Sequence, residues 1–287
     1  MKKIFSFFAI TFIYLNVAYS QENNLILVHP TEYNLKLFTY LIDNNIIDID
    51  NLSITGIYHK NEVYDYSKSE SFLAKNNYPS IALKEITEDI KVDQLYQLNE
   101  CTKVYSELFK KSKGVLFFGG PDLPPAIYGE QMSLLTRMID PYRHYFEASF
   151  LFHLLGGSQN SEFNPLLKEN PDYTVYAICL GMQTINIATG GTMVQDIPSE
   201  IYNLEFVEGV LQIDNNRQHR NYYNNISIDS TLFSGSFHEI KIINQKALVG
   251  DYNKNLNPLI YSNHHQAIES LGEDLVVLAT STDGKNN

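Results

Sequence analysis

The chain has 287 residues, of which 44% are apolar and 19% charged, with 33 acidic against 21 basic side chains. This length and composition are sufficient for a hydrophobic core, and they exclude a disordered, collagen-like or disulfide-stapled chain. The formal net charge is −12, and no run of Lys and Arg exceeds two residues. The sequence therefore argues against a nucleic-acid partner, whose phosphates a basic surface would have to neutralise.

The first twenty residues predict a secretory signal. Two lysines precede a mainly apolar stretch over residues 4–18, and Ala18 and Ser20 are small residues at the positions that a signal peptidase recognises. The apolar run of about 15 residues favours a cleaved signal over a membrane anchor, which needs about 20. We expect a mature domain over residues 21–287 that has no membrane span and is exported, to the periplasm or the medium.

The first third of the chain alternates between strand and helix patterns. Residues 24–29 and 52–58 are apolar runs typical of strands, and Thr31 is a candidate N-cap for the helical pattern that follows it. A second helix is predicted over residues 89–111, with Cys101 on its apolar face. A buried core thiol is the simplest interpretation of Cys101.

The same alternation continues beyond residue 111. Buried strands are predicted over 115–118 and 175–178, and helices after Asp140 and over 180–188. Residues 205–265 contain shorter, more polar strands and loops. Strands that alternate with helices at this spacing predict an α/β domain, with a mostly parallel sheet covered by helices on both faces.

Cys179 has the context of a nucleophile. A strand ends at Cys179 and a helix begins at Leu180, which is the layout of a nucleophile elbow, and Gly181 leaves room for the tight turn. The helix N-terminus is expected to lower the thiol pKa, and the Leu180 N–H could donate to an oxyanion. The alternatives are a plain core cysteine and, in an oxidising compartment, a disulfide with Cys101.

Two glycines follow the strand at 115–118 and support this interpretation. A glycine lets a backbone N–H approach a ligand closely, so Gly119 or Gly120 could supply a second oxyanion donor. An ordinary tight turn is the alternative, because the motif is weak by itself.

Together these motifs resemble the class I glutamine-amidotransferase-like hydrolases, specifically the γ-glutamyl-γ-aminobutyrate hydrolase family. The resemblance covers most of the chain from about residue 114 onward, and residues 25–113 match only loosely. Its segments are VLFFGGPDLPPAIYGE (115–130), DPYRHYFEASFL (140–151), YAICLGMQTINIATGGTMVQDI (176–197), FHEIKI (237–242) and SNHHQAIESLGEDLVVLATSTDG (262–284). Ala177 departs from the superfamily, which often has glycine there, and the added β-carbon is a small steric change.

The resemblance implies a flavodoxin-like glutamine-amidotransferase fold and a Cys–His–Glu hydrolase without a cofactor. Cys179 would attack the γ-carbonyl of a small γ-glutamyl substrate to form a thioester, while the N–H of Leu180 and that of Gly119 or Gly120 hold the oxyanion. A histidine would take the thiol proton and return it to the leaving amine. Gln183 matches a position beside the bound glutamyl group.

The catalytic base of that family has no match in the chain. The family carries its His and Glu in a late G-V-Q-[FW]-H-P-E segment, and this sequence stops at Asn287, just before that segment is due. His238 precedes Glu239, but it matches an upstream strand. We expect a domain without its C-terminal strand, helix and base. Either the sequence belongs to a truncated hydrolase, or the protein is a pseudoenzyme that binds a γ-glutamyl ligand or a partner.

Other polar residues have weaker signals. His264 and His265 match an S-x-H-H-Q segment that is expected to shape the pocket, and one of them could replace the missing base. His219-Arg220 is either a solvated loop or a substrate contact. Arg143 and Glu147 lie four positions apart on a helix and are expected to pair.

No Cys, His and Asp spacing predicts a metal site, and no phosphate-binding loop is present in the sequence. An amidotransferase that feeds ammonia to a synthase is disfavoured, because export would separate it from ATP-dependent partners.

Overall fold

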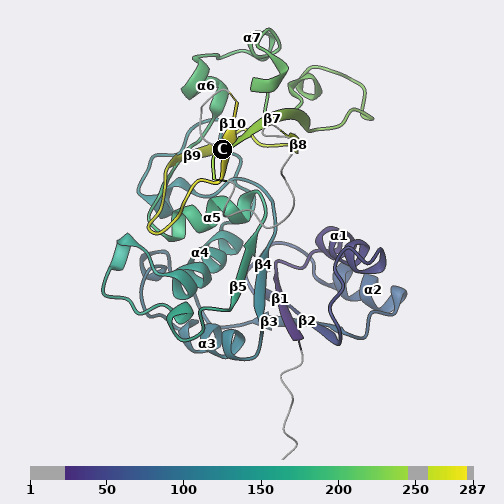
Figure 1. Cartoon of the computed structure of the whole chain (residues 1–287), viewed down its shortest axis with the longest axis vertical. Helices are drawn as coiled ribbons and strands as arrows, with labels where there is room; N and C mark the ends of the chain where they lie inside the picture. The colour runs from purple at the N-terminus through teal and green to yellow at the C-terminus, as the bar shows by residue number, and fades with distance from the viewer. Residues whose placement is uncertain (1–22, 245–257, 283–287) are drawn as a thin grey trace, which may run out of the picture.

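A computed structural model describes residues 23–244 and 258–282, so the predicted signal over residues 1–20 lies outside the described part (Figure 1). Its centre is a parallel sheet with the strand order β3-β2-β1-β4-β5. The strands are β1 (Asn23–Val28), β2 (Leu52–His59), β3 (Ile81–Ile86), β4 (Gly114–Phe117) and β5 (Thr174–Ala177). In the described ranges, no helix combines the length and the apolar character that a membrane crossing needs.

Helices cover both faces of this sheet. The helices are α1 (Glu32–Asp43), α2 (Ser67–Asn76), α3 (Thr102–Lys110), α4 (Pro141–Leu155) and α5 (Leu180–Ala188). Side chains of successive strand residues point to opposite faces, so Ile26 and Val28 join the core beneath α3, α4 and α5, whereas Leu27 joins the core beneath α1 and α2. Figure 1 shows the two helical layers on either side of the strands. The predicted flavodoxin-like α/β fold is confirmed.

Two predicted helix starts are confirmed by their caps. The Thr31 side chain accepts a hydrogen bond from the Asn34 N–H, and Asp140 accepts one from the Arg143 N–H. Such side-chain acceptors satisfy backbone donors that have no partner in the first turn of a helix. Both caps lie at the carboxyl edge of the sheet, where β1 and β4 end.

The predicted helix over residues 89–111 is wrong in its first half. Only Val92–Gln94, a 3₁₀ turn, and Thr102–Lys110 are helical. The Asn99 amide donates to the Gln94 carbonyl, and its oxygen accepts from the Cys101 N–H. Asparagine thus offers the backbone an alternative to the helix. Cys101 is fully buried and is not in a disulfide, which confirms the core thiol.

The prediction of a buried strand at 175–178 is also wrong. β5 is an edge strand of the described sheet, and the Tyr176 side chain is 62% exposed. Its apolar sequence is that of a strand with neighbours on both sides. β3 and α2 have no counterpart in the prediction, because their polar sequences bury few side chains.

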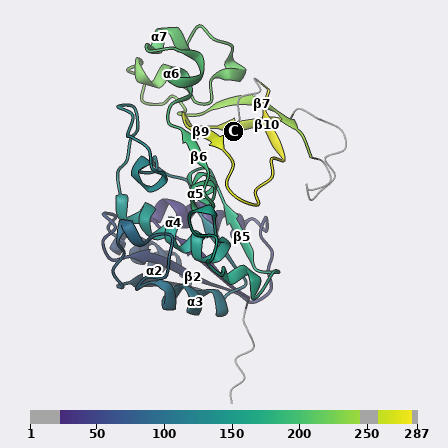
Figure 2. The ribbon, with the colours of Figure 1, turned by 90° about the vertical axis from the view of Figure 1, so that its left-hand side faces the viewer.

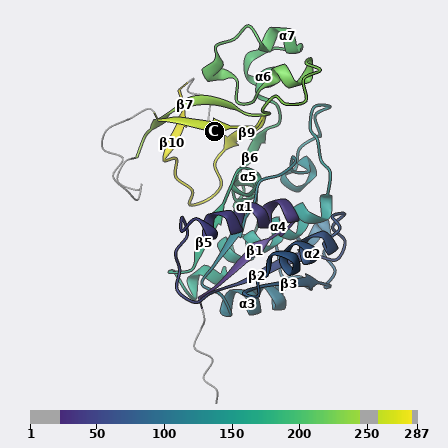
Figure 3. The same ribbon diagram turned by 90° about the vertical axis from the view of Figure 1, so that its right-hand side faces the viewer.

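A second layer lies over the carboxyl edge of the sheet (Figures 2 and 3). It contains antiparallel strands in the orders β10-β7-β8 and β6-β9. Its elements are β6 (Thr192–Val194), α6 (Ile197–Tyr202), α7 (Val207–Val210), β7 (Ser236–Ile242), β8 (Leu259–Ser262), β9 (Ala267–Ser270) and β10 (Ala279–Ser281). Short 3₁₀ helices occupy Pro125–Tyr128, Ser158–Asn160, Leu166–Lys168, Asn215–Arg217 and Tyr222–Asn225. The short polar strands predicted within 205–265 are confirmed.

Candidate active site

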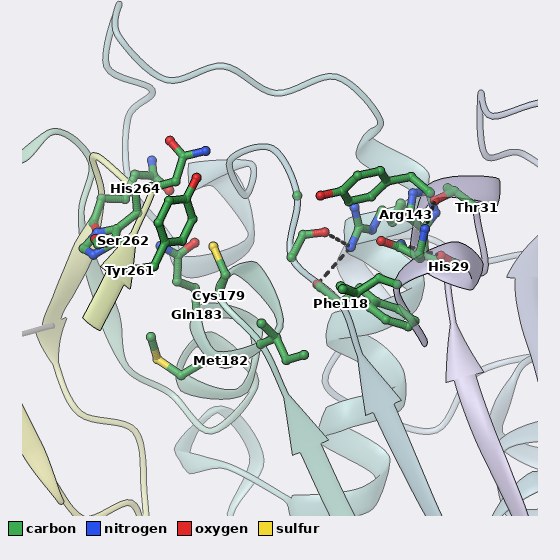
Figure 4. A pocket seen from close by; sticks show the side chains of 18 of the residues that line it. His29, Thr31, Phe118, Arg143, Cys179, Met182, Gln183, Tyr261, Ser262 and His264 are labelled. Carbon is green, nitrogen blue, oxygen red and sulfur yellow. Dashed lines mark hydrogen bonds between the residues drawn. The ribbon is translucent and has the colours of Figure 1, made fainter. Parts of the chain in front are cut away.

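A cavity of about 750 Å³ lies between the carboxyl ends of β1, β4 and β5 and the second layer (Figure 4). In a parallel sheet, ligands bind at this edge where the strand order reverses, and here the order reverses between β1 and β4. The cavity lining includes His29, Gly119, Gly120, Cys179, Gln183 and His264. The structure therefore gathers all the predicted site residues except Leu180 and His265 around one cavity.

Cys179 occupies a strained turn between β5 and α5. Its backbone has φ 54° and ψ −110°, a conformation that non-glycine residues rarely adopt. A β-carbon on Gly181 would lie 2.8 Å from the Phe117 carbonyl oxygen, so glycine is needed two residues after the turn. The elbow raises the Cys179 side chain to an exposed position in the cavity. This is the arrangement expected of a nucleophile elbow.

Two backbone N–H groups are directed at the Cys179 sulfur. They belong to Leu180, the first residue of α5, and to Gly120 in the loop after β4. Paired N–H donors at such a position can hold the oxygen anion that forms when a nucleophile attacks a carbonyl. Of the two predicted glycines, Gly120 directs its N–H at the sulfur, and Gly119 packs beside the β-carbon of Cys179.

The Arg143 side chain orients this loop from behind. Its Nη2 donates to the carbonyl oxygens of Phe118 and Gly119, at 3.1 Å each. The Gly119 carbonyl and the Gly120 N–H belong to one trans peptide unit and point in opposite directions. Holding the carbonyl toward Arg143 therefore turns the N–H toward Cys179. A β-carbon on Gly120 would collide with the Arg143 guanidinium, so close approach requires this glycine.

Arg143 is itself held by Glu147, as the i, i+4 spacing predicts. Its Nε donates to Glu147 Oε1 at 2.7 Å, and both side chains are buried. Burial raises the pKa of the Glu147 carboxyl, and the positive charge and hydrogen bond of Arg143 oppose this increase. The pair is therefore part of the core under the loop and is not a surface salt bridge.

The predicted lowering of the Cys179 pKa is wrong as a net effect. Desolvation raises the pKa of the thiol above its ordinary value, and the N–H groups of Leu180 and Gly120 and the charge of Arg143 only partly oppose this. The protonated thiol is therefore the resting form at neutral pH, and a base is needed to generate the nucleophile.

Alkylation measures this directly. We expect the rate of Cys179 modification by iodoacetamide to rise about tenfold per pH unit from pH 7 to 9, because only the thiolate reacts. Cys101 is an internal control, since burial raises the pKa of its thiol to about 11. The rates would be followed by mass spectrometry in the wild type and in the Cys101→Ser variant. A plateau below pH 8 would show that the thiol pKa is not raised.

His265 lies apart from the main cavity, between two carboxylates. Its Nδ1 is 2.9 Å from Asp196 Oδ1, and its Nε2 is 3.0 Å from Asp122 Oδ2. Burial disfavours the imidazolium, but these hydrogen bonds raise the pKa of His265 to about 8. With both ring nitrogens engaged as donors, His265 has no free site for a proton from Cys179. The structure thus argues against His265 as a replacement base.

His264 lines the cavity, with its Nδ1 2.8 Å from the Gln266 carbonyl oxygen. Burial lowers the pKa of His264 to about 4, so the ring is neutral. In the described part of the chain, no hydrogen bond connects the Cys179 sulfur to a histidine. The described residues therefore place a thiol beside two backbone N–H donors, and no histidine among them contacts that thiol.

One polar cluster of the cavity, around His29, was not predicted from the sequence. His29 follows β1 in a left-handed conformation with φ 57°, and its Nδ1 lies 2.6 Å from Glu62 and 2.8 Å from the Tyr66 hydroxyl. β1 and β5 are separated by β4, so at about 4.8 Å per strand His29 is about 10 Å from the elbow. His29 is therefore a wall residue and not a partner of Cys179. The position of His29 directly after a buried strand is the sequence feature that could have predicted a cavity residue here.

A smaller pocket adjoins the main one and shares Gly120, Cys179, Gln183 and His264 with it. Two cations, Arg137 and Arg220, line this smaller pocket. The guanidinium of Arg220 also lies over the Tyr222 ring, 4.8 Å from its centroid. Gln183 is buried where the two pockets meet, so it could contact a ligand in either of them.

Comparison with known proteins agrees with this geometry. The family model described as Peptidase C26 matches residues 94–285. The chain is 31% identical over 166 residues to "Putative glutamine amidotransferase Rv2859c" of Mycobacterium tuberculosis, covering 58% of this chain and 42% of that protein. It is 24% identical over 170 residues to "Putative glutamine amidotransferase-like protein YvdE" of Lactococcus lactis, covering 59% and 56%. The chain thus spans about half the length of these relatives. The chain belongs to the Peptidase C26 family, whose members are class I glutamine-amidotransferase-like proteins.

Proposed function

We propose that this protein hydrolyses γ-glutamyl amide bonds through a thioester on Cys179. Membership of its family already points to amide-bond hydrolysis or amide transfer. The observation that supports the nucleophile is the strained elbow, with the N–H groups of Leu180 and Gly120 directed at the sulfur. The Cys179 thiolate would add to the γ-carbonyl, the amine would leave with a proton, and water would then release glutamate.

The smaller pocket supports a glutamyl group as the acyl part of the substrate. A glutamyl group carries an α-carboxylate a few bonds from the reacting carbonyl. Arginine is suited to binding carboxylates, and Arg137 and Arg220 line the pocket that shares Cys179. The Gln183 amide, between the two pockets, could hold the γ-glutamyl chain. The predicted signal peptide would place this reaction outside the cytoplasm.

We further propose that the base belongs to a strand that pairs with β5. Without β3, the order β2-β1-β4-β5 corresponds to the first four strands of the flavodoxin-like order, whose fifth strand would lie beside β5. A parallel strand there would end next to Cys179, and it would cover Tyr176, which is now 62% exposed. Reading the DNA beyond codon 287 in three frames tests this, and the absence of any His-x-Glu segment would contradict it.

A second candidate function is binding without turnover. It is favoured by the raised pKa of the Cys179 thiol and by the absence of a histidine hydrogen bond to its sulfur in the described residues. Such a pseudoenzyme would use the same pockets to bind glutamate, glutamine or a γ-glutamyl compound.

Hydrolysis of γ-glutamyl-p-nitroanilide and of glutamine by the full chain distinguishes the two functions. We expect a chain that includes the strand proposed to carry the base to release product, and Cys179→Ser in that chain to lower kcat by about 10³-fold or more because the nucleophile is lost. The matched control, Cys101→Ser, alters the other cysteine, which is buried in the core, and should retain activity.

Calorimetry with glutamate and glutamine completes the test. Binding without hydrolysis would support the pseudoenzyme and contradict the hydrolase. If the protein neither binds these ligands nor hydrolyses the substrates, both candidate functions are contradicted.

A further inference from the structure

We propose that His219, His238 and His264 form a binding site for a transition-metal ion such as Zn²⁺. One ligand atom from each of the three rings lies within 4.8 Å of the other two. The three histidines come from separate segments of the second layer: the loop after Asn215–Arg217, the strand β7, and the turn after β8. They are the one such group of three among the described residues.

The backbone holds these three segments in place around the rings. The His219 carbonyl accepts a hydrogen bond from the Ser262 hydroxyl at 2.8 Å and another from the His264 N–H at 3.0 Å. The His219 ring lies 4.7 Å from the His238 ring and 5.0 Å from the His264 ring, measured between centroids. The cluster is therefore built by the fold and does not depend on flexible surface side chains.

Two of the rings are oriented as metal-ligating histidines usually are. The Nδ1 of His264 lies 2.8 Å from the Gln266 carbonyl oxygen, and the Nδ1 of His238 lies 3.1 Å from that of Glu239. A carbonyl can only accept, so each Nδ1 carries the proton and each Nε2 keeps its lone pair. This pattern, in which one ring nitrogen binds a backbone carbonyl and the other a metal, fixes the tautomer in many metalloproteins.

The composition of the cluster selects the class of metal. It consists of imidazoles alone, which suit Zn²⁺, Cu²⁺ and Ni²⁺, whereas Mg²⁺ and Ca²⁺ prefer oxygen ligands. Zn–N bonds of about 2.0–2.1 Å place tetrahedral ligand atoms about 3.4 Å apart. Because the ligand atoms lie within 4.8 Å of one another, binding requires them to move closer by up to about 1.4 Å, which small side-chain rotations provide.

The surroundings of the cluster are compatible with a cation. The neighbouring His265 lies between the carboxylates of Asp122 and Asp196. His264 also lines the main cavity, which provides an entry path and room for a fourth ligand such as water.

Zinc titration of the metal-stripped full chain tests the proposal. We expect one Zn²⁺ per chain with a micromolar or tighter Kd. His219→Gln and His238→Gln should each weaken binding by about 100-fold or more. His153→Gln is the matched control, because His153 is equally buried but lies on α4, outside the cluster. Cys179→Ser should bind Zn²⁺ as the wild type does, which would exclude the thiolate as the ligand.

X-ray absorption of the zinc-loaded wild type gives a readout that needs no variant. Imidazole ligands at about 2.0–2.1 Å are expected, without a sulfur shell. A wild type that binds no Zn²⁺ at 100 μM would overturn the proposal and leave the histidines as packed rings. Binding that survives His238→Gln, or a sulfur shell, would also overturn it. None of these readouts depends on hydrolysis, so the proposed function can fail while this site stands.

Discussion

Replacing Arg143 with methionine is expected to destabilise the fold by about 3–5 kcal/mol, because it leaves the buried carboxylate of Glu147 without its partner. The same substitution should lower kcat for γ-glutamyl hydrolysis by about 10²-fold or more. Without the guanidinium, the carbonyls of Phe118 and Gly119 lose their common donor. The Gly120 N–H is then no longer held toward the sulfur. Loss of one oxyanion donor typically lowers kcat by about 10²-fold or more.

A double variant separates the two effects of Arg143. Arg143→Met/Glu147→Met removes both charges and replaces them with apolar chains of similar length, so we expect most of the stability to return. The loss in kcat should remain, since neither methionine can donate to the loop carbonyls. Thermal unfolding and steady-state kinetics would be measured on the same preparations. Recovery of both stability and kcat in the double variant would show that Arg143 has no positioning role.

Arg143→Lys provides an intermediate case. An ammonium keeps the positive charge near Glu147 but lacks the planar fork that reaches the carboxylate and two carbonyls together. We expect it to retain more stability than Arg143→Met while its kcat stays low. A lysine variant with wild-type kcat would mean that charge alone orients the loop.

The central fold was predictable because it depends on local periodicity. Short continuous runs of apolar residues define β1 and β4, and α5 has the bounds that its pattern predicts. The prediction of a helix over 89–111 was wrong where a single side chain, Asn99, competes for backbone hydrogen bonds. β5 was assigned as buried because an apolar strand has the same sequence whether or not a neighbour covers it.

The candidate site was predictable only where it is contiguous in sequence. The elbow at Cys179 is local, and so is the glycine pair after β4. The raised pKa of the thiol is a consequence of desolvation by distant segments, which no local pattern records. The histidine cluster was missed for the same reason, since its members stand 19 and 26 positions apart, farther than the ligands of short zinc motifs.

Acidification below about pH 6.5 is expected to destabilise the protein, through buried neutral histidines on α4. Burial lowers the pKa of His144 to about 3 and that of His153 to about 4. Both values lie below the 6.5 of an unfolded histidine, so the unfolded chain takes up protons first as the pH falls. Their contribution to stability is complete above pH 6.5 and is lost progressively below it.

The size of this effect follows from the same pKa values. Each group costs about 1.4 kcal/mol per pH unit below 6.5, so at pH 4 the two together remove about 6 kcal/mol. Protonation of the unfolded chain at His29 would destabilise the fold by a similar amount, because burial lowers the pKa of His29 to about 3. Its hydrogen-bond partner Glu62 offsets this loss of stability. Burial raises the pKa of Glu62 to about 7, so the folded state gains a proton there. Domains are commonly stable by only 5–15 kcal/mol, so a loss of about 6 kcal/mol should bring the acid transition close to pH 4.

His144→Phe should shift the midpoint of this acid transition to lower pH. Both ring nitrogens of His144 are buried without hydrogen-bond partners among the described residues, so an apolar ring removes a desolvation cost and adds no unpaired group. At pH 7.5, by contrast, the free energy of unfolding should rise or stay within about 1 kcal/mol, since no proton is taken up there. Urea unfolding at both pH values measures the difference. An equal change at both pH values would mean that packing, and not protonation of His144, governs the acid limb.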